Sequence, residues 1–438
     1  MYLNAQHTLT SRSLPAIAFF LGQALVWADP VQPPSFFDSL EIGGEVRFKG
    51  EFKEDYNFTG SDQSYFLTRF RANGTLDLGE HARIFVEGQD ARVFGENEKG
   101  SPVVDADVIP NIFENPFDLH QAYLEFSPGA AQVRAGRQRV RGLYDRLFWS
   151  KEWLNTSLVY DGILVKLPTQ HGRVWNIFSV RAVPALPSGF DDWRKTGKRI
   201  SDSSLSGIVV DDPTLLSPGV LKYFWLFRHN GPTDDNVHSF GTVFSRKTKF
   251  FPIKLEAAYQ DGEYGGTGHQ AWMFCASISK DAGKFGQAGF HYNYASGDGD
   301  PGDGKHGTFD NTQPRNHINY GYMDFFALQN LHSLEASLVK NALDKNFTLR
   351  LAYNAFWLDK PDTDSWYNAG MRVVRTSSTT GTDPYVGSEA DLSMRYQISE
   401  DFRLEAGASC FFPGGYIRQT GGSQKVPKFF YLSCSSNF

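Results

Sequence analysis

Residues 134–146 place five arginines and one acid within a short segment. The arginines are Arg134, Arg137, Arg139, Arg141 and Arg146, and the acid is Asp145. A guanidinium forms two parallel hydrogen bonds with a carboxylate, so such a cluster suits solutes that carry carboxylates. The segment predicts an electropositive constriction. Arg137 falls at the end of a strand-like run, and an outward orientation is the alternative for it.

Further cations and acids alternate with apolar residues elsewhere in the chain. We interpret them as polar groups that line a solute path, where rings of charge set selectivity. The alternative is that they pair with one another and only brace a wall. The cations are Arg47, Lys49, Arg69, Arg71, Arg350, Arg395 and Arg403, and the acids are Glu125, Glu389 and Asp391.

The elements that carry these residues have a period of two. In Glu41–Phe52, Ile42, Val46 and Phe48 share one face, and charged side chains occupy the other. Four similar runs follow around residues 69–78, 347–354, 389–396 and 402–409. Runs of about ten residues exceed the usual strand of a soluble sheet and match a tilted bilayer crossing. A row of charges cannot be buried in a sandwich core, but a water-filled lumen accepts it.

These runs predict an all-β protein, a transmembrane antiparallel barrel of roughly 16 to 18 strands with long extracellular loops. The 37 Phe, 19 Tyr and 42 Gly fit a pleated, turn-rich chain. Beyond the N-terminus, no apolar run is long enough for a membrane helix. The net charge of −6 gives no reason to expect nucleic acid.

Both ends of the chain carry signals for export. Residues 1–28 are typical of a signal peptide, with Arg12 before the apolar stretch Leu14–Val26. Residues 29–438 are then one barrel domain. The last segment ends on Phe438 and alternates, like the terminal strand that outer-membrane assembly recognises. We expect a bacterial outer-membrane protein.

Three stretches interrupt the alternation and are predicted as long loops: Pro184–Val220, Ser296–Asn316 and Asp359–Pro384. Within the second, Asp298, Asp300 and Asp303 are spaced like calcium ligands, although a solvated acidic loop is the alternative. No cysteine spacing suggests a metal site. Cys410 and Cys434 fall on apolar positions and are expected to face lipid.

Several segments resemble the alginate export family of outer-membrane porins. They are the run from Asp118 to Trp149 with the following Tyr160-Asp161-Gly162, the run from Tyr294 to Leu331, Ala355–Gly370, and Val386–Gly415. The resemblance implies passive export of an acidic, alginate-like polysaccharide through an Arg-lined lumen, without a cofactor. It also implies contact with outer-membrane lipid and possible periplasmic secretion partners.

Other functions remain open at this point. A general or anion-selective diffusion porin for small solutes shares every feature except the polymer path. An outer-membrane enzyme would need acid–base groups, for which Asp118 with His120, and His317, are the candidates; no Gly-x-Ser-x-Gly motif accompanies them. His120 falls in the apolar phase of its run. A purely adhesive barrel would be narrow and filled.

Overall fold

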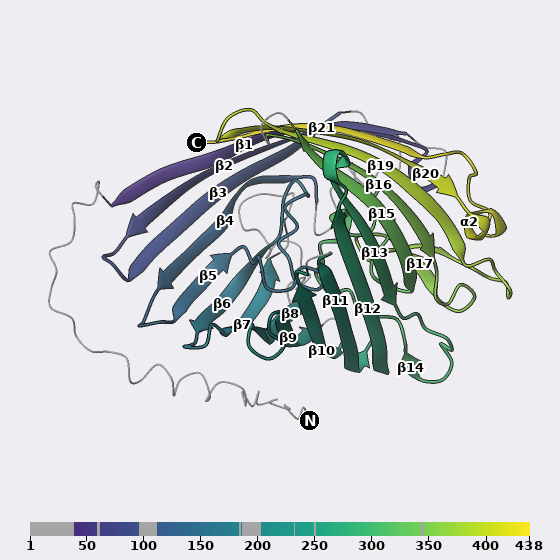
Figure 1. The fold of residues 1–438 in the computed structure, drawn as a ribbon, viewed down its shortest axis with the longest axis horizontal. Helices are drawn as coiled ribbons and strands as arrows, with labels where there is room; N and C mark the ends of the chain where they lie inside the picture. Colours follow the sequence, from purple (N-terminus) through teal and green to yellow (C-terminus); the bar gives the residue numbers. More distant parts are fainter. Residues whose placement is uncertain are drawn as a thin grey trace, which may run out of the picture.

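Eighteen antiparallel strands close into one barrel in the part of the chain that the computed structural model describes (Figure 1). The described residues are 39–58, 62–95, 112–183, 185, 203–231, 233–248, 251–342 and 346–438. The predicted signal peptide, residues 1–28, lies outside them. The fold prediction is confirmed.

The first nine strands of the barrel are β1 (Leu40–Glu54), β2 (Gln63–Asp77), β3 (Ala82–Phe94), β4 (Asn115–Phe126), β5 (Gln132–Gln138), β6 (Val159–Pro168), β7 (Val174–Val183), β8 (Ser203–Asp212) and β9 (Val220–Asn230). The other nine are β10 (Asp235–Arg246), β11 (Ile253–Tyr264), β12 (Thr267–Asp281), β13 (Gln287–Ala295), β15 (Leu331–Ala342), β16 (Phe347–Trp357), β19 (Tyr385–Gln397), β20 (Phe402–Pro413) and β21 (Lys428–Asn437). The loops carry β14 (Lys305–His306), the hairpin of β17 (Ser365–Tyr367) with β18 (Val373–Thr376), and α2 (Gly415–Gln419).

Strand β1 closes the barrel because it pairs with both β2 and β21. Gly50, for example, faces Phe66 of β2 and Leu432 of β21. A closed sheet leaves no strand edge unpaired, which a bilayer core requires. No helix among the described residues is long and apolar enough to cross a membrane.

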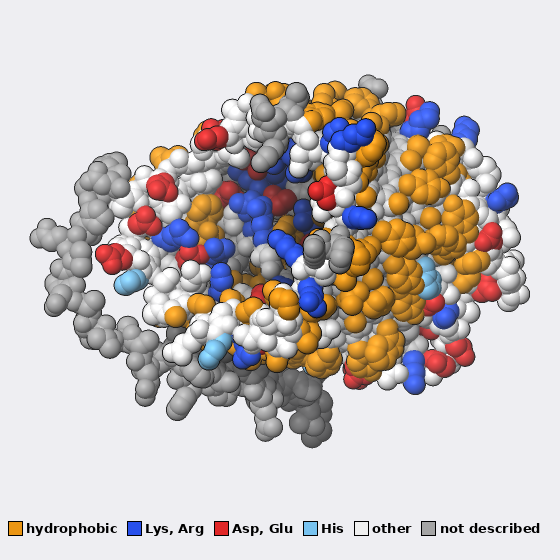
Figure 2. All heavy atoms as spheres, viewed as in Figure 1, with side chains coloured by type: hydrophobic (Ala, Val, Ile, Leu, Met, Phe, Trp, Pro, Cys, Tyr) orange, Lys and Arg blue, Asp and Glu red, His pale blue; other side chains and the backbone are white. Residues whose placement is uncertain are grey.

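The alternation along β1 separates lipid from lumen. Phe48 and Phe52 are 55% and 44% exposed on the outer face, whereas Lys49 and Glu51 are 3% and 5% exposed on the inner face. Figure 2 shows the same division, with apolar side chains over the outer wall and Lys and Arg gathered in a hollow. Cys410 and Cys434 share the outward phase of Phe412 and Leu432, as predicted.

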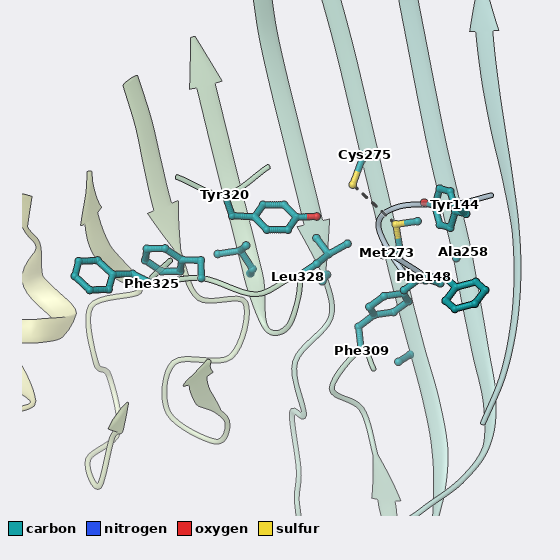
Figure 3. Packing of buried hydrophobic residues seen from close by; sticks show 14 of the residues in the cluster. Tyr144, Phe148, Ala258, Met273, Cys275, Phe309, Tyr320, Phe325 and Leu328 are labelled. Atoms are coloured by element: carbon teal, nitrogen blue, oxygen red, sulfur yellow. Dashed lines mark hydrogen bonds between the residues drawn. The ribbon is translucent and has the colours of Figure 1, made fainter. Parts of the chain in front are cut away.

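Two inward connections fill part of the lumen. We call residues 139–158, between β5 and β6, the first lumenal loop, and residues 296–330, between β13 and β15, the second lumenal loop. Their apolar side chains form a core inside the barrel with inward residues of neighbouring strands (Figure 3). Phe148 of the first loop stacks on Phe178 of β7 with ring centroids 4.9 Å apart. The inner face on this side of the wall is therefore largely apolar, unlike the charged face of β1, with buried polar residues such as Glu256 and Gln260 among the apolar ones.

One predicted loop is wrong in part. Pro184–Val220 contains β8, which pairs along its length with β7 and β9. The sequence of β8 begins Ser-Ser-Leu-Ser-Gly within a polar stretch, so its alternation is weak. Ser296–Asn316 lies in the second lumenal loop, and Asp359–Pro384 is a long connection that carries the β17–β18 hairpin.

Candidate permeation path

Glu152 lies at the centre of a cluster of arginines inside the barrel. Its carboxylate oxygens are 3.0 Å from Arg71, 3.6 Å from Arg69, and 3.3 Å from both Arg139 and Arg141. Burial by itself would raise the pKa of Glu152, but these four guanidiniums hold it well below its usual value. Glu152 is therefore ionised and fastens the first lumenal loop to β2.

The backbone of the first lumenal loop is also bound to β1. The guanidinium of Arg47 donates to the carbonyl oxygens of Glu152 and Leu154, both at 3.0 Å. The ammonium of Lys49 lies 3.2 Å from the centroid of the Trp153 ring, a cation–π contact. These inward cations of β1 thus hold the loop across the lumen.

The two lumenal loops are hydrogen-bonded to each other. Trp149 donates its backbone N–H to Gln313 at 2.8 Å, Gln313 donates to Leu147 at 3.0 Å, and Arg315 donates to Asp145 at 2.9 Å. Satisfied backbone groups make this crossing a fixed part of the protein interior. The crossing divides the lumen into an apolar, filled side and a charged, open side.

A cavity of about 1110 Å³ occupies the open side. Eleven Lys and Arg side chains and six Asp and Glu side chains of the described residues line it, so positive charge is in excess. The cations are Arg47, Lys49, Lys53, Arg69, Arg139, Arg141, Lys151, Arg315, Arg372, Arg395 and Arg403, and the acids are Glu45, Glu51, Glu87, Glu152, Asp324 and Glu405. The arrangement favours anions.

Half of the residues that the sequence marked for the path line this cavity. They are Arg47, Lys49, Arg69, Arg139, Arg141, Arg395 and Arg403. Arg71 is not part of the cavity lining: it is 1% exposed, and its guanidinium pairs with Glu152. The others lie away from the cavity: Arg146 in the first lumenal loop, and on the inner wall Arg134, Arg350, Glu125, Glu389 and Asp391.

The residues away from the cavity are paired with neighbours. Arg134 contacts Glu125 at 2.5 Å, and Arg350 contacts Glu335 at 2.5 Å. Arg146 is buried among apolar residues and contacts Glu256 at 2.9 Å. These side chains pair with neighbouring charges, as expected if they only brace the wall.

The acids Glu389 and Asp391 of β19 are almost fully buried. Glu389 accepts a hydrogen bond from the backbone of Met323 at 2.9 Å, and Asp391 accepts one from the Ser409 hydroxyl at 2.6 Å. Glu389 thereby attaches the second lumenal loop to the wall. Both acids hold structure together away from the open cavity.

The period of two alone did not predict on which face of the barrel the side chains of Arg137 and His120 lie. Arg137 lies on the outer face, where its guanidinium pairs with Asp161 at 2.9 Å, as the alternative for it anticipated. His120 was placed in the apolar phase, which is wrong. An irregularity in the pairing of β3 with β4 at this point shifts the phase, so His120 is buried on the inner side, 3.9 Å from Glu87.

The three candidate calcium ligands each accept a hydrogen bond from a nearby backbone N–H of their own loop. Asp298 binds the N–H of Asp300, Asp300 that of Gly302, and Asp303 that of Lys305. Among the described residues, no three acidic, His or Cys side chains are grouped to hold a metal. These contacts support the solvated-loop alternative.

Sequence reasoning missed the cavity residues that the loops supply, chiefly Lys151, Glu152, Trp153 and Arg315. The sequence did contain one signal for them. The first lumenal loop includes Leu143, Tyr144, Leu147 and Phe148, too many large apolar residues for a water-exposed connection.

Comparisons with known proteins agree with this architecture. A family model described as "Alginate export" matches residues 38–429. The structure of Pseudomonas aeruginosa OccK2 (OpdF), solved in complex with glucuronate, matches with a TM-score of 0.62 at 10% identity, over 92% of this chain and 99% of that chain. Acinetobacter baumannii OccAB4 matches with a TM-score of 0.61 at 13% identity, over 91% and 98%. At these identities the likeness shows the fold alone. No curated protein matches the chain.

Proposed function

Because the chain belongs to the alginate export family and is a bacterial outer-membrane channel, we propose that it exports an acidic, alginate-like polysaccharide. The polymer passes through the cavity beside the lumenal loops. The observation that carries the proposal is the excess of cations over acids among the cavity-lining residues.

The physical basis is charge exchange along the path. A polyuronate carries one carboxylate per sugar, so an excess of positive charge raises its local concentration in the channel. Acids such as Glu45, Glu152 and Glu405 lie beside the cations and compete for them. This competition keeps each contact weak enough to be released, as conduction requires. Transport is passive, with no covalent step, nucleotide or cofactor.

The proposed partners follow from the surfaces and the direction of transport. Exposed apolar residues of the outer wall, such as Phe48 and Leu432, contact outer-membrane lipid. Periplasmic secretion proteins deliver the polymer to the short-turn end, which faces the periplasm in outer-membrane barrels. The family and fold are those of transport channels, and nucleic acid is not a proposed partner.

An anion-selective diffusion porin for small solutes is the second candidate. The barrel fold is shared with OccK2, whose structure contains glucuronate, a single uronic acid. A lining that attracts the carboxylate of a polymer would also attract that of a monosaccharide. The two functions differ in whether a long chain enters the cavity.

Single-channel recording in planar bilayers separates the candidates. We expect polymannuronate to interrupt the current for long periods, and neutral dextran of the same length to leave it unchanged. The reversal potential in a KCl gradient should show anion preference. A channel that passes glucuronate but never responds to polymannuronate on either side would be a small-solute porin.

A further inference from the structure

The cavity cations differ in whether an acid already neutralises them. Lys49 and Lys53 lie 2.5 Å and 3.2 Å from Glu51. Arg395 lies 2.7 Å from Glu405. Arg69, Arg139 and Arg141 share Glu152, as described above, and Arg403 and Arg315 lie 3.8 Å and 3.9 Å from Glu405 and Asp145. For these cations, a carboxylate of the cargo must displace a carboxylate of the protein.

Three cations of the lining have no carboxylate within 4 Å in the part of the chain that is described: Arg47, Lys151 and Arg372. Arg47 is buried, and both terminal nitrogens of its guanidinium donate to loop carbonyls or to the amide oxygen of Asn155. Arg372 is exposed on the connection between β16 and β19, where water and salt screen its charge. Lys151 alone combines partial burial with an ammonium that no described side chain accepts.

Lys151 lines the cavity through which the cargo would pass. The residue precedes Glu152 in the first lumenal loop, and its φ of 49° lies in the left-handed region that side chains rarely adopt. Glu152 contacts Arg71 of β2 and Trp153 contacts Lys49 of β1, and these contacts fix the backbone that follows Lys151. Burial without a counter-charge lowers the pKa of Lys151 to about 8. A partly buried ammonium without a counter-charge gains more binding free energy from an incoming carboxylate than an ammonium that already pairs with an acid of the protein.

We propose that Lys151 is the specificity-determining cation of the channel, the first side chain to form an ion pair with the carboxylate of the cargo. The proposal rests on the proposed function and deepens it. The arginines predicted from sequence then hold the first lumenal loop in place and line the cavity, while Lys151 determines which solutes bind. One ammonium engages one carboxylate at a time, so a polyuronate advances past it one sugar after another.

The test compares Lys151→Met and Lys151→Arg with the wild-type channel, in planar bilayers with polymannuronate. Lys151→Met should weaken the block roughly tenfold, the value of one charge-assisted contact. Lys151→Arg should keep the block. Lys284→Gln, at the β12–β13 turn outside the cavity, is the matched control and should behave as wild type.

A pH series gives a second, independent readout. In wild type the block should weaken as pH rises from 7 to 9, because Lys151 loses its proton near pH 8. Lys151→Arg should show a smaller step, since a guanidinium stays charged, while Lys49 lines the same cavity in both channels. An unchanged block in Lys151→Met would overturn the proposal for Lys151 while leaving the polymer channel intact. A wild-type channel that polymannuronate never blocks would overturn the proposed function itself.

Discussion

The rings of Trp153 and His317 stack inside the lumen, with centroids 3.7 Å apart and planes inclined by 14°. The ammonium of Lys49 lies 3.2 Å from the same Trp153 centroid. Two groups at these distances cannot share one face, so they cover opposite faces of the indole. Tyr322 stacks on His317 at 4.8 Å, and Asp324 lies 3.0 Å from its Nδ1. The stack joins β1 to both lumenal loops.

Replacing His317 by alanine should weaken this contact between β1 and the two lumenal loops. An aromatic stack contributes about 0.5–1.5 kcal/mol beyond its buried area. We expect His317→Ala to increase the open-channel noise and the mean conductance, both measured in planar bilayers at constant salt. His81→Ala, in the β2–β3 turn, is the control. Noise and conductance equal to wild type would show that the backbone bonds between the loops suffice.

Replacing Glu152 by glutamine should increase anion selectivity. Four guanidiniums lose their shared counter-charge, and one unit of charge a few ångströms away changes the potential by about 1 kcal/mol in water. The ratio of anion to cation permeability, taken from the reversal potential in a KCl gradient, should rise about fivefold. Glu54→Gln, whose exposed carboxylate pairs with Lys428 on the outer face, should not change the ratio. A fall in the ratio for Glu152→Gln would contradict the assigned role.

The strands could be predicted because lipid and water impose a period of two. Glu41–Phe52 alternates clearly, and β1 spans Leu40–Glu54. The exceptions have local causes. Near His120 the pairing irregularity inverts the phase without any mark in the residue types. In β8, Ser and Gly replace the large side chains that make alternation visible.

The candidate site was less predictable than the wall. Arg69 was identified because a cation in an alternating run must face water, and Arg139 and Arg141 because they belong to the arginine cluster at 134–146. Their common partner Glu152 belongs to a connection with no periodicity, and its position depends on packing of residues such as Phe148 against β7. Whether a cation binds cargo or braces the wall depends on its partner. The sequence shows which residues are charged but not which of them form ion pairs with one another.

The stability that Glu152 provides should depend on pH in a defined direction. Its pKa is lowered in the folded protein, so its contribution is present above the unfolded pKa of about 4.3 and is lost as pH falls through the lower, folded pKa. Glu152 is 20% exposed, which reduces the contribution to the order of 2 kcal/mol.

The measurement is the difference in melting midpoint between wild type and Glu152→Gln, followed by loss of β-sheet circular dichroism in detergent. We expect a constant difference from pH 8 to pH 5 and a decline below about pH 4. Taking the difference removes the effect of other groups that both proteins share. A difference that declines between pH 7 and pH 5 would mean that the guanidiniums do not stabilise the ionised carboxylate.

A charge on the outer wall should prevent assembly in lipid. Leu432 of β21 is 60% exposed on the outer face, between the inward residues Tyr431 and Ser433. An arginine on the lipid face near the bilayer midplane costs about 2–4 kcal/mol, because the bilayer core cannot solvate its charge. Leu432→Arg should therefore reduce the folded fraction in phospholipid vesicles, read as the heat-modifiable band on gels, whereas Leu432→Met should fold as wild type. Equal folding of the arginine variant would place this part of β21 outside the hydrocarbon region.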